Sequence, residues 1–480
     1  MKLVAADDPK KHEQPEATGI SAEGLVGYLN ALKVQGLDLH GLLVHQRGYP
    51  GVEAYRWPFH GNRPRTWHSI AKAFTATAMC FALEENLFAL TDKVVDFFTD
   101  DVPPEVSDHL AAMTIRDLLS MRTGHAEETS GSRWRGIKTS WIAEFLKIPV
   151  VHPPGDVFVY TSAASYMLSA ILTRVTRLTL HEYLRPRLFE PLDIHGETWD
   201  VGPDGVNPGG NGLACTIADL LKLGMLYLQK GHWNGKQIVP EARIVEATRP
   251  IGDSDYGLHW VTGPDGACFA MGLFGQLIAI LPAYETVIVI AGAINRSDGC
   301  SGVVVPLLLQ HLPSIFPGES KANTRPTELD DYRERLTRPP QLASSAPAPI
   351  GLRRYAMAKN STGIDEIVFH MSRLQCTIEL SYSGVLRTIQ VGIDRWMEGQ
   401  TDISGAQIHH GYDAAPATVV AGGRWLSETE LEMNWIFPGM TFRDTVLCDF
   451  RNRRLLWNRR SNVNSSDVHM PALHGFLIQG

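Results

Sequence analysis

The stretch of sequence that decides the fold is Trp67-His68-Ser69-Ile70-Ala71-Lys72-Ala73-Phe74-Thr75. Ser69 and Lys72 form the one Ser-x-x-Lys tetrad in the chain. The apolar residues that follow Ser69 recur on a helical period, which predicts a helix: Ala71, Phe74, Ala78, Met79 and Leu83. Residues three apart share one face of a helix, so we expect Lys72 to reach the Ser69 hydroxyl.

The chemistry of this pair is that of an activated nucleophile. A serine hydroxyl attacks poorly until a base removes its proton. A lysine amine serves as that base only when burial or a neighbouring cation lowers its pKa, and the small and apolar neighbours of Lys72 are compatible with burial. The helix N-terminus also places backbone N–H groups near Ser69, where an oxyanion would develop. Taken alone, the tetrad is better explained by a solvated serine and lysine.

A second polar group stands at Tyr160-Thr161-Ser162, between the stretch 153–159 (Pro-Pro-Gly-Asp-Val-Phe-Val) and an apolar run that predicts a helix over 165–175. A Tyr-x-polar triplet in this place can bring a phenol and a hydroxyl to the same pocket as Ser69. By itself the triplet is better explained by a tyrosine packed at the end of a strand or loop.

Strand and helix signals alternate around these motifs. The predicted strands are 42–45, 52–55, 277–280 and 286–291, the last two paired across the Pro282 turn. The further predicted helices are 114–121, with Thr114 as N-cap, and 218–228. The predicted strands stand at both ends of this region of the sequence, and the predicted helices lie between them. This order predicts an α/β sandwich with a large helical insertion.

Together these segments resemble the superfamily of serine hydrolases that includes class C β-lactamases, DD-peptidases and carboxylesterases. The resemblance runs in the expected order over about residues 20–316. The matching segments are 67–75, Met113–Gly124, Pro154–Tyr160, Leu188–Leu192, Asp219–Leu228, Trp233–Lys236 and Gly272–Gln276. It implies an α+β fold of the β-lactamase/transpeptidase type, an antiparallel sheet with a helical domain.

The resemblance also implies residue roles. Ser69 would attack the substrate and form an acyl-enzyme, and Lys72 would move its proton. Tyr160 resembles the family's second general base, which acts on the leaving group and later on water. The backbone N–H groups of Ser69 and Leu273 match the positions of the oxyanion hole.

Two departures from the family pattern concern substrate binding. The usual Tyr-x-Asn is Tyr-x-Ser here, so Ser162 offers a hydroxyl in place of an amide. The third box, normally Lys-Thr-Gly or His-x-Gly, is Ala270-Met271-Gly272 and lacks its cation, although Gly272 remains. Three arginines from elsewhere in the chain are alternative sources of that charge: Arg122, Arg133 and Arg135.

His125 is a further substrate-binding candidate, because it follows the Thr123-Gly124 turn on a loop that faces the pocket in this family, and functional residues gather on loops. Packing within the protein is the alternative for His125.

The length of 480 residues exceeds one ordinary core and predicts two domains. We expect a hydrolase domain over 1–317 and a linker rich in Pro, Ser and Ala over 318–350, with one helical stretch at 329–336. A C-terminal antiparallel, barrel-like β domain is expected over 351–480. Its predicted strands are 367–369, 377–380, 386–393, 418–420, 431–436, 445–450 and 455–457.

Composition narrows the class of protein. The net charge of −8 disfavours nucleic acid and anionic membranes as partners, and the arginine-rich run 451–460 is interpreted as a solvated hairpin. Residues 1–11 show no signal-peptide pattern, and six scattered cysteines without a CxxC pair favour reduced thiols in the cytoplasm. The sequence has no zinc-site spacing and no nucleotide-binding motif, so neither a metal nor a cofactor is expected.

Three functions remain open at this point. The first is hydrolysis of small neutral esters or amides through an acyl-enzyme on Ser69. The second is acyl transfer on the same scaffold, which uses the same residues but a different acceptor. The third is a catalytically silent relative that binds a ligand, which the missing third-box cation favours and the retained Ser69, Lys72 and Tyr160 oppose. A small-molecule substrate is the expected partner, and homo-oligomerisation is left open.

Overall fold

The computed structural model describes residues 19–318, 327–413 and 415–480, without the side chains of 131–133 and 327. The chain separates into two compact units. The first comprises Met1–Tyr55, His60–Gly292 and Asp298–Arg333, and the second comprises Arg56–Phe59, Ala293–Ser297 and Glu334–Gly480. The stretch 1–11 and part of the predicted linker lie outside the described residues.

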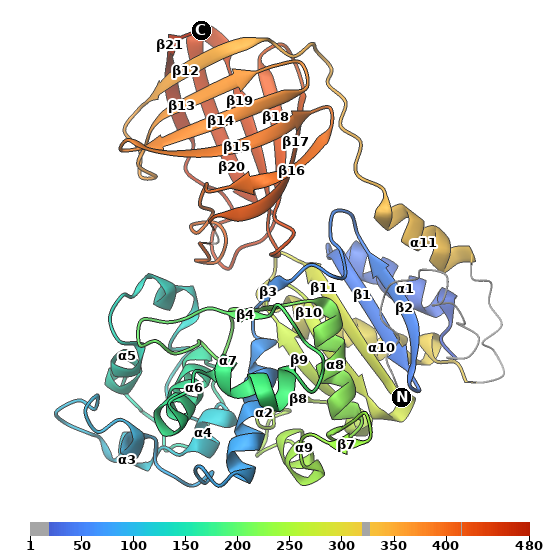
Figure 1. Cartoon of the computed structure of the whole chain (residues 1–480), viewed down its shortest axis with the longest axis vertical. Helices are drawn as coiled ribbons and strands as arrows, with labels where there is room; N and C mark the ends of the chain where they lie inside the picture. Colours follow the sequence, from blue (N-terminus) through green and yellow to red (C-terminus); the bar gives the residue numbers. More distant parts are fainter. Residues whose placement is uncertain (1–18, 319–326, 414) are drawn as a thin grey trace. The chain divides into compact units, whose positions relative to one another are not determined.

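The first unit is built on a six-stranded sheet with the order β2-β1-β11-β10-β9-β8 (Figure 1). Its strands are β1 Asp38–Gln46, β2 Tyr49–Tyr55, β8 Val261–Thr262, β9 Cys268–Gly272, β10 Gln276–Leu281 and β11 Thr286–Ala293. Every residue of β10 and β11 is buried, as expected for central strands covered on both faces. The strand pair predicted across Pro282 is confirmed as β10 and β11, with Leu281 opposite Thr286.

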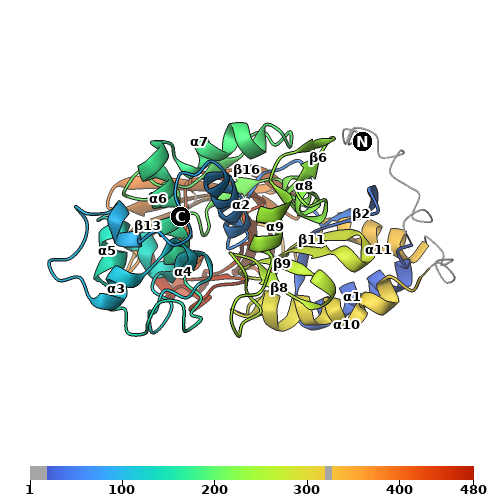
Figure 2. The same ribbon diagram turned by 90° about the horizontal axis from the view of Figure 1, so that it is seen from below.

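Helices cover both faces of this sheet. Helices α1 (Ala22–Val34) and α10 (Val305–Ile315) lie on one face and α8 (Ile217–Leu228) on the other (Figure 2). The start of α1 is tied to the end of α10, because the Ser21 N–H donates a 2.8 Å hydrogen bond to the carbonyl of Ile315. These helices make the sheet a buried layer, as the α/β sandwich predicts.

A helical region is inserted between β2 and β8. Its helices are α2 Ala71–Glu84, α3 Asp108–Ala112, α4 Ile115–Leu119, α5 Trp141–Lys147, α6 Ser162–Thr176, α7 Leu180–Leu184 and α9 Glu241–Ala247. Short strands accompany them: β3 Arg65–Trp67, β4 Thr198–Trp199, β5 Leu213–Cys215, β6 His232–Trp233 and β7 Lys236–Gln237. Every residue of α2 from Ala71 to Leu83 is buried. A helix buried on all sides is a core element, so α2 gives its first turn a rigid position.

Two helix starts show how local sequence sets the boundaries. Thr114 caps α4 in a reciprocal capping box with Asp117, as the sequence predicted for Thr114. Helix α6 begins at Ser162, three residues earlier than predicted, because the Thr161 side chain accepts a hydrogen bond from the Ala163 N–H and caps it there.

The second unit is a closed antiparallel β-barrel preceded by α11 (Thr327–Thr337). Its strands are β12 Gly351–Met357, β13 Ile364–Met371, β14 Gln375–Tyr382, β15 Val385–Ile393, β16 Trp396–Thr401, β17 Ala417–Trp425, β18 Glu430–Ile436, β19 Arg443–Asp449, β20 Arg454–Ser461 and β21 Leu473–Gln479. The last strand, β21, pairs with the first, β12. A short parallel pairing of the end strand β15 with β17, the neighbour of the other end strand β16, closes the sheet. Closure removes the exposed edges that an open sheet would present.

Aromatic side chains fill part of the barrel core. The ring of Phe369 lies 5.1 Å from Phe450 and 6.2 Å from Trp457, and Trp435 lies 6.0 Å from Trp457. Each of the predicted C-terminal strands coincides with an observed strand. Strands β12, β16 and β21 were not predicted, because charged, glycine and polar residues interrupt their apolar pattern.

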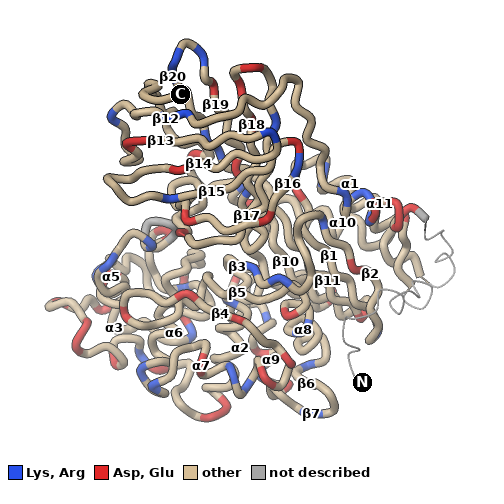
Figure 3. The backbone as a smooth tube through the Cα atoms, turned by 45° about the horizontal axis from the view of Figure 1, so that its top comes forward, with Lys and Arg blue, Asp and Glu red and all other residues tan. Residues whose placement is uncertain are grey.

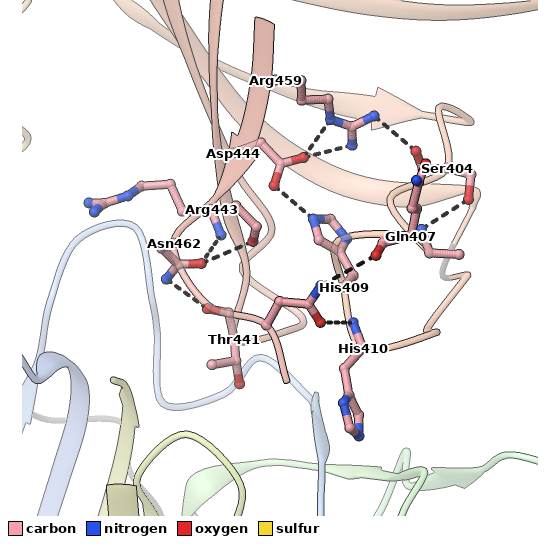
Figure 4. A network of polar contacts seen from close by, with 12 residues as sticks. Ser404, Gln407, His409, His410, Thr441, Arg443, Asp444, Arg459 and Asn462 are labelled. Atoms are coloured by element: carbon pink, nitrogen blue, oxygen red, sulfur yellow. Dashed lines mark hydrogen bonds and ion pairs between the residues drawn. The ribbon is translucent and has the colours of Figure 1, made fainter. Parts of the chain in front are cut away.

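A buried ion-pair network makes Arg459 the exception to the solvated hairpin predicted for the arginine-rich run, whose other arginines are exposed. Arg459 is buried and its Nε donates to Asp444 Oδ2 at 2.8 Å, while His409 Nε2 lies 2.7 Å from Asp444 Oδ1 (Figure 4). Burial by itself raises the pKa of Asp444, but His409 and Arg459 hold that pKa below its ordinary value. The network therefore anchors the loop that carries His409 to strand β19.

The structure also shows the state of the cysteines and the distribution of charged residues (Figure 3). All six cysteines are buried and free. Basic and acidic residues are interspersed along both units (Figure 3). Across residues 19–318, 327–413 and 415–480, no helix has the length and apolar character needed to cross a membrane.

Loss of the barrel should expose apolar side chains of the N-terminal half. Trp57 lies 4.9 Å from Trp396, and Phe59 packs against Val420 and Ile436. Burying a side chain of this size contributes about 1.5–3 kcal/mol, so a chain ending at residue 318 should be less soluble than the full chain. The yield of soluble protein measures this. Trp57→Ser together with Phe59→Ser should restore it, and a soluble, monodisperse unmodified truncation would contradict the expectation.

Candidate active site

Ser69 lies on the tight turn between β3 and α2. The Trp67 side chain before it is buried and its Nε1 donates to the carbonyl of Cys215 at 3.0 Å. The Lys72 N–H donates to the carbonyl of Ser69 at 3.0 Å, which closes the turn. A strand fixed on one side and a core helix on the other therefore hold Ser69, which is itself partly exposed.

Lys72 is the polar centre of the site. Its side chain is 2% exposed. Its Nζ donates to Ser69 Oγ at 3.1 Å, to Ser162 Oγ at 3.0 Å and to the carbonyl oxygen of Gly210 at 3.2 Å. Three acceptors match the three donors of a lysine ammonium. The structure thus brings together Ser69 and Lys72, as their spacing predicted, and adds Ser162, which the resemblance implied for the same site.

The third acceptor comes from a glycine segment that the sequence analysis did not identify. A Cβ on Gly210 would lie 3.2 Å from Lys72 Nζ and 3.2 Å from the carbonyl oxygen of Ser162. The carbonyl oxygen of Gly209 accepts a 2.6 Å hydrogen bond from Thr75 on α2. The absence of side chains lets this segment pack directly against the helix that carries Lys72.

Tyr160 borders the same ammonium. Lys72 Nζ lies 4.8 Å from the centroid of the Tyr160 ring, within the range of a cation–π contact. The Tyr160 ring meets Tyr256 edge-on at 6.2 Å. Burial, and then the charge of Tyr160, raises the pKa of Tyr256. Tyr160 is therefore positioned beside Lys72, and its role as a base stays a prediction.

A buried histidine lies behind the site. His259 Nδ1 lies 2.8 Å from the carbonyl oxygen of Leu119, and its Nε2 lies 2.8 Å from Ser165 Oγ. Burial, and then the charge of Lys72, lowers the pKa of His259 to about 3. The ring is therefore neutral at pH 7. It donates from Nδ1 and accepts the Ser165 hydroxyl at Nε2.

The turn that carries Leu273 is tied to the segment before Ser69. Gln276 Oε1 accepts a 2.9 Å hydrogen bond from the His68 N–H, and the His68 ring meets Phe274 edge-on at 5.5 Å. A Cβ on Gly272 would lie 2.4 Å from Gln276 Oε1, so only glycine allows the Gln276 side chain to reach His68. These contacts tie the turn that contains Leu273 to the segment before Ser69, and the role of Leu273 in the oxyanion hole stays a prediction.

Comparison with known families gives this geometry a context. A family model described as Beta-lactamase matches residues 38–301, more than half of the 480 residues. The chain belongs to the beta-lactamase family. The matched range includes Ser69, Lys72, Tyr160 and the Leu273 turn, so it covers the site described above.

Solved structures of low sequence identity share the fold. A Bacteroides dorei DSM 17855 protein provisionally named a beta-lactamase is 17% identical with a TM-score of 0.53, over 62% of this chain and 100% of that chain. EstCE1, described as a hydrolase with promiscuous acyltransferase activity, is 15% identical with a TM-score of 0.51, over 61% and 99%. A Bacillus anthracis protein provisionally named a 6-aminohexanoate-dimer hydrolase is 18% identical with a TM-score of 0.51, over 60% and 81%.

Within this family member, the third box offers no charge. Ala270 is buried and Met271 is partly buried on β9. Arg122 donates to the carbonyl oxygen of Asp156 at 2.6 Å and to Asp253 Oδ1 at 2.6 Å. Arg135 donates to Asn211 Oδ1 at 2.6 Å. Both arginines are therefore engaged elsewhere, and the side chain of Arg133 lies outside the described residues.

His125 is held inside the protein. It is 1% exposed, its Nδ1 lies 2.8 Å from Thr123 Oγ1, and its ring meets Phe145 at 5.0 Å. Burial lowers the pKa of His125 to about 4. The geometry favours packing as the role of His125, and contact with substrate stays a prediction.

Glu128 is a site residue that the sequence analysis missed. Its Oε1 accepts a 3.0 Å hydrogen bond from the Ser162 N–H and a 2.7 Å hydrogen bond from Ser130 Oγ. No periodicity or motif marks a glutamate on an irregular loop, so only the folded chain reveals it. Among the described residues, no cluster of three or more His, Cys, Asp or Glu side chains could hold a metal ion.

Proposed function

We propose that this beta-lactamase-family protein is a serine hydrolase that forms an acyl-enzyme on Ser69 and cleaves small neutral esters or amides. The observation that carries the proposal is the buried Lys72, whose Nζ lies 3.1 Å from Ser69 Oγ. That distance lies within hydrogen-bond reach of the proton that must be removed. A lysine that served only as a solubilising surface charge would not be 2% exposed.

The proton route follows from the contacts of Lys72. When its amine is neutral, the Nζ lone pair accepts the Ser69 proton as Oγ attacks the substrate carbonyl. Ser162 Oγ and the carbonyl oxygen of Gly210 hold the resulting ammonium through the other two N–H groups. The backbone N–H groups of Ser69 and Leu273 stabilise the oxyanion. Tyr160 gives a proton to the leaving group and then takes one from the water that releases the acyl group.

The discrimination against acyl groups that carry a carboxylate follows from the third box. A cation–carboxylate hydrogen bond in a partly desolvated site is worth about 1.5–3 kcal/mol, or roughly ten- to a hundredfold in affinity. Ala270 and Met271 have no charge, and Arg122 is bound to Asp253. A substrate carboxylate would therefore lose its hydration without a described cation to replace it.

The test compares nitrocefin, an anionic β-lactam, with a neutral p-nitrophenyl ester of similar size. The expected kcat/KM is higher for the ester by about tenfold or more, because the site lacks the cation that binds a carboxylate. Ser69→Ala serves as the background control for both substrates. Nitrocefin turnover more efficient than that of the ester would contradict the proposed substrate class.

Acyl transfer is the second candidate, and the likeness to EstCE1 favours keeping it. Both reactions share the acyl-enzyme, and the acceptor decides between them. Adding a primary alcohol or amine during ester turnover separates the two. A hydrolase gives the free acid as its main product, whereas an acyltransferase gives the new ester or amide at acceptor concentrations far below that of water. The silent-relative alternative predicts no Ser69-dependent product of either kind.

A further inference from the structure

Glu128 and Lys72 are connected through a single residue. Ser162 donates its backbone N–H to Glu128 Oε1 at 3.0 Å, and its own hydroxyl oxygen accepts from Lys72 Nζ at 3.0 Å. Glu128 and Ser162 are both partly exposed, as are Ser69 and Tyr160. The carboxylate therefore lies within a few hydrogen bonds of the nucleophile and remains accessible to a small molecule.

Capping of α6 does not account for the charge on Glu128. Ser162 is the first residue of α6, and the helix already has an N-cap in Thr161, whose hydroxyl accepts from the Ala163 N–H. The Glu128 contacts at the helix end and at Ser130 all use Oε1. A glutamine would offer the same acceptor atom, so these hydrogen bonds require the oxygen, and the charge gains from them only the favourable field of the helix N-terminus.

The charge on Glu128 has no partner among the residues that the structure describes. Among the described residues, Glu128 forms no ion pair, and its Oε2 accepts no hydrogen bond from any of them. Lys72 gives its three N–H groups to the neutral oxygens of Ser69, Ser162 and Gly210. A partly desolvated carboxylate without a counter-ion costs free energy, and this cost falls when a cation binds beside it.

The third box and the Glu128 carboxylate therefore favour the same kind of ligand, one that carries a positive charge and no carboxylate. The third box contributes Ala270 and Met271, which cannot bind a carboxylate through charge. Arg122 is engaged with Asp253 and Arg135 with Asn211. Lys72 is the one cation described at the site, and its three N–H groups are given to Ser69, Ser162 and Gly210. The other described side chains named here supply a carboxylate for a ligand cation and no available cation for a ligand carboxylate.

We propose that Glu128 determines specificity by binding an ammonium group of the substrate, so that the preferred substrates are esters or amides with an amine a few bonds from the scissile carbonyl. This inference rests on the acyl-enzyme chemistry of the proposed function and changes its substrate class from neutral esters or amides to those that carry an ammonium group. A charge-assisted hydrogen bond to Oε2 would supply the preference.

The experiment compares three p-nitrophenyl esters: butyrate, its ammonium isostere the β-alanine ester, and the anionic monosuccinate. Rates are corrected for uncatalysed hydrolysis. The wild-type protein should favour the β-alanine ester over butyrate in kcat/KM by about tenfold or more, with the monosuccinate slowest. Glu128→Gln keeps the Oε1 acceptor and should bring the ratio of β-alanine ester to butyrate close to one. Because both kcat/KM values are measured on the same variant, their ratio is unchanged by a distortion of α6 that slows the two esters equally.

Matched variants isolate the charge at this position. Glu127→Gln removes an equal charge from the exposed neighbour and should keep the wild-type ratio. Glu128→Asp retains the charge on a shorter side chain and should keep part of the preference. An equal ratio in the wild type and in Glu128→Gln, or a wild-type preference for the monosuccinate, would overturn the inference.

Failure of the proposed function gives a different pattern. If neither ester shows Ser69-dependent turnover, hydrolysis is refuted, and the ammonium site is then judged by binding. In Ser69→Ala, NMR titration should show tighter binding of β-alaninamide than of butyramide, and Glu128→Gln in that background should remove the difference. Equal binding of the two amides would overturn the ammonium site independently of turnover.

Discussion

Ser69→Ala is expected to lower the hydrolysis of a short-chain p-nitrophenyl ester by about a thousandfold or more, the scale seen when a nucleophile is removed. The reason is geometric, since Ser69 Oγ is the hydroxyl that Lys72 Nζ reaches at 3.1 Å on an accessible turn. The absorbance of the released p-nitrophenolate, followed over time, measures the effect.

The matched control for this variant is Ser165→Ala, which removes a buried hydroxyl on α6 that hydrogen-bonds to His259 rather than to Lys72. The thermal midpoint of Ser69→Ala should stay near that of the wild type. Ser165→Ala leaves the buried Nε2 of His259 without its donor, so it should lose about 1–3 kcal/mol of stability while it keeps ester turnover. Wild-type turnover in Ser69→Ala would show that the nucleophile has been assigned to the wrong residue.

Lys72→Ala and Tyr160→Phe should each slow the reaction by about a hundredfold or more, as expected for positioned acid–base groups. Lys72→Ala removes the group that receives the Ser69 proton, and Tyr160→Phe keeps the ring 4.8 Å from Lys72 Nζ while removing only the phenol oxygen. The measurement is kcat/KM for the same ester, with circular dichroism to confirm folding.

The double variant tests whether the two groups act as one unit. Residues that share a proton network lose most of the activity at the first substitution, so the second adds little. The rate of Lys72→Ala/Tyr160→Phe should therefore lie well above the product of the two single effects. A rate equal to that product would contradict a shared network.

Periodicity and motif spacing predicted the parts of the fold whose structure depends on local sequence. The helix after Ser69, the Thr114 cap and the β10–β11 pair all follow from residues close together in the chain. The reach of Lys72 to Ser69 followed from helix geometry alone, because the two residues are three apart on one turn.

The parts that could not be predicted depend on distant residues. Gly210 meets Lys72 across 138 positions of sequence and Gln276 meets His68 across 208, and neither carries a local signal. The contact of Glu128 with Ser162 could be expected only if α6 were known to begin at Ser162, and the apolar pattern predicted that start three residues too late. Strand β12 pairs with β13 and β21, and β21 pairs with β20, so their mixed sequences gain strand structure from partners that include a strand far away in the chain.

The domain boundaries at 317 and 351 stay predictions. The structure assigns Arg56–Phe59 and Ala293–Ser297 to the unit that contains the barrel. Sequence composition could not foresee this, because those short segments interrupt a region that otherwise matches one family model.

Covalent labelling with a fluorophosphonate tests most directly whether Ser69 is an activated nucleophile. The probe reacts with a serine only when a base and an oxyanion site assist it, and mass spectrometry of the digested protein locates the adduct. We expect one adduct, on the peptide that contains Ser69, formed quickly in the wild type and far more slowly in Lys72→Ala. An unlabelled wild-type protein, or an adduct on another serine, would contradict the assignment of Ser69 and Lys72 as the catalytic pair.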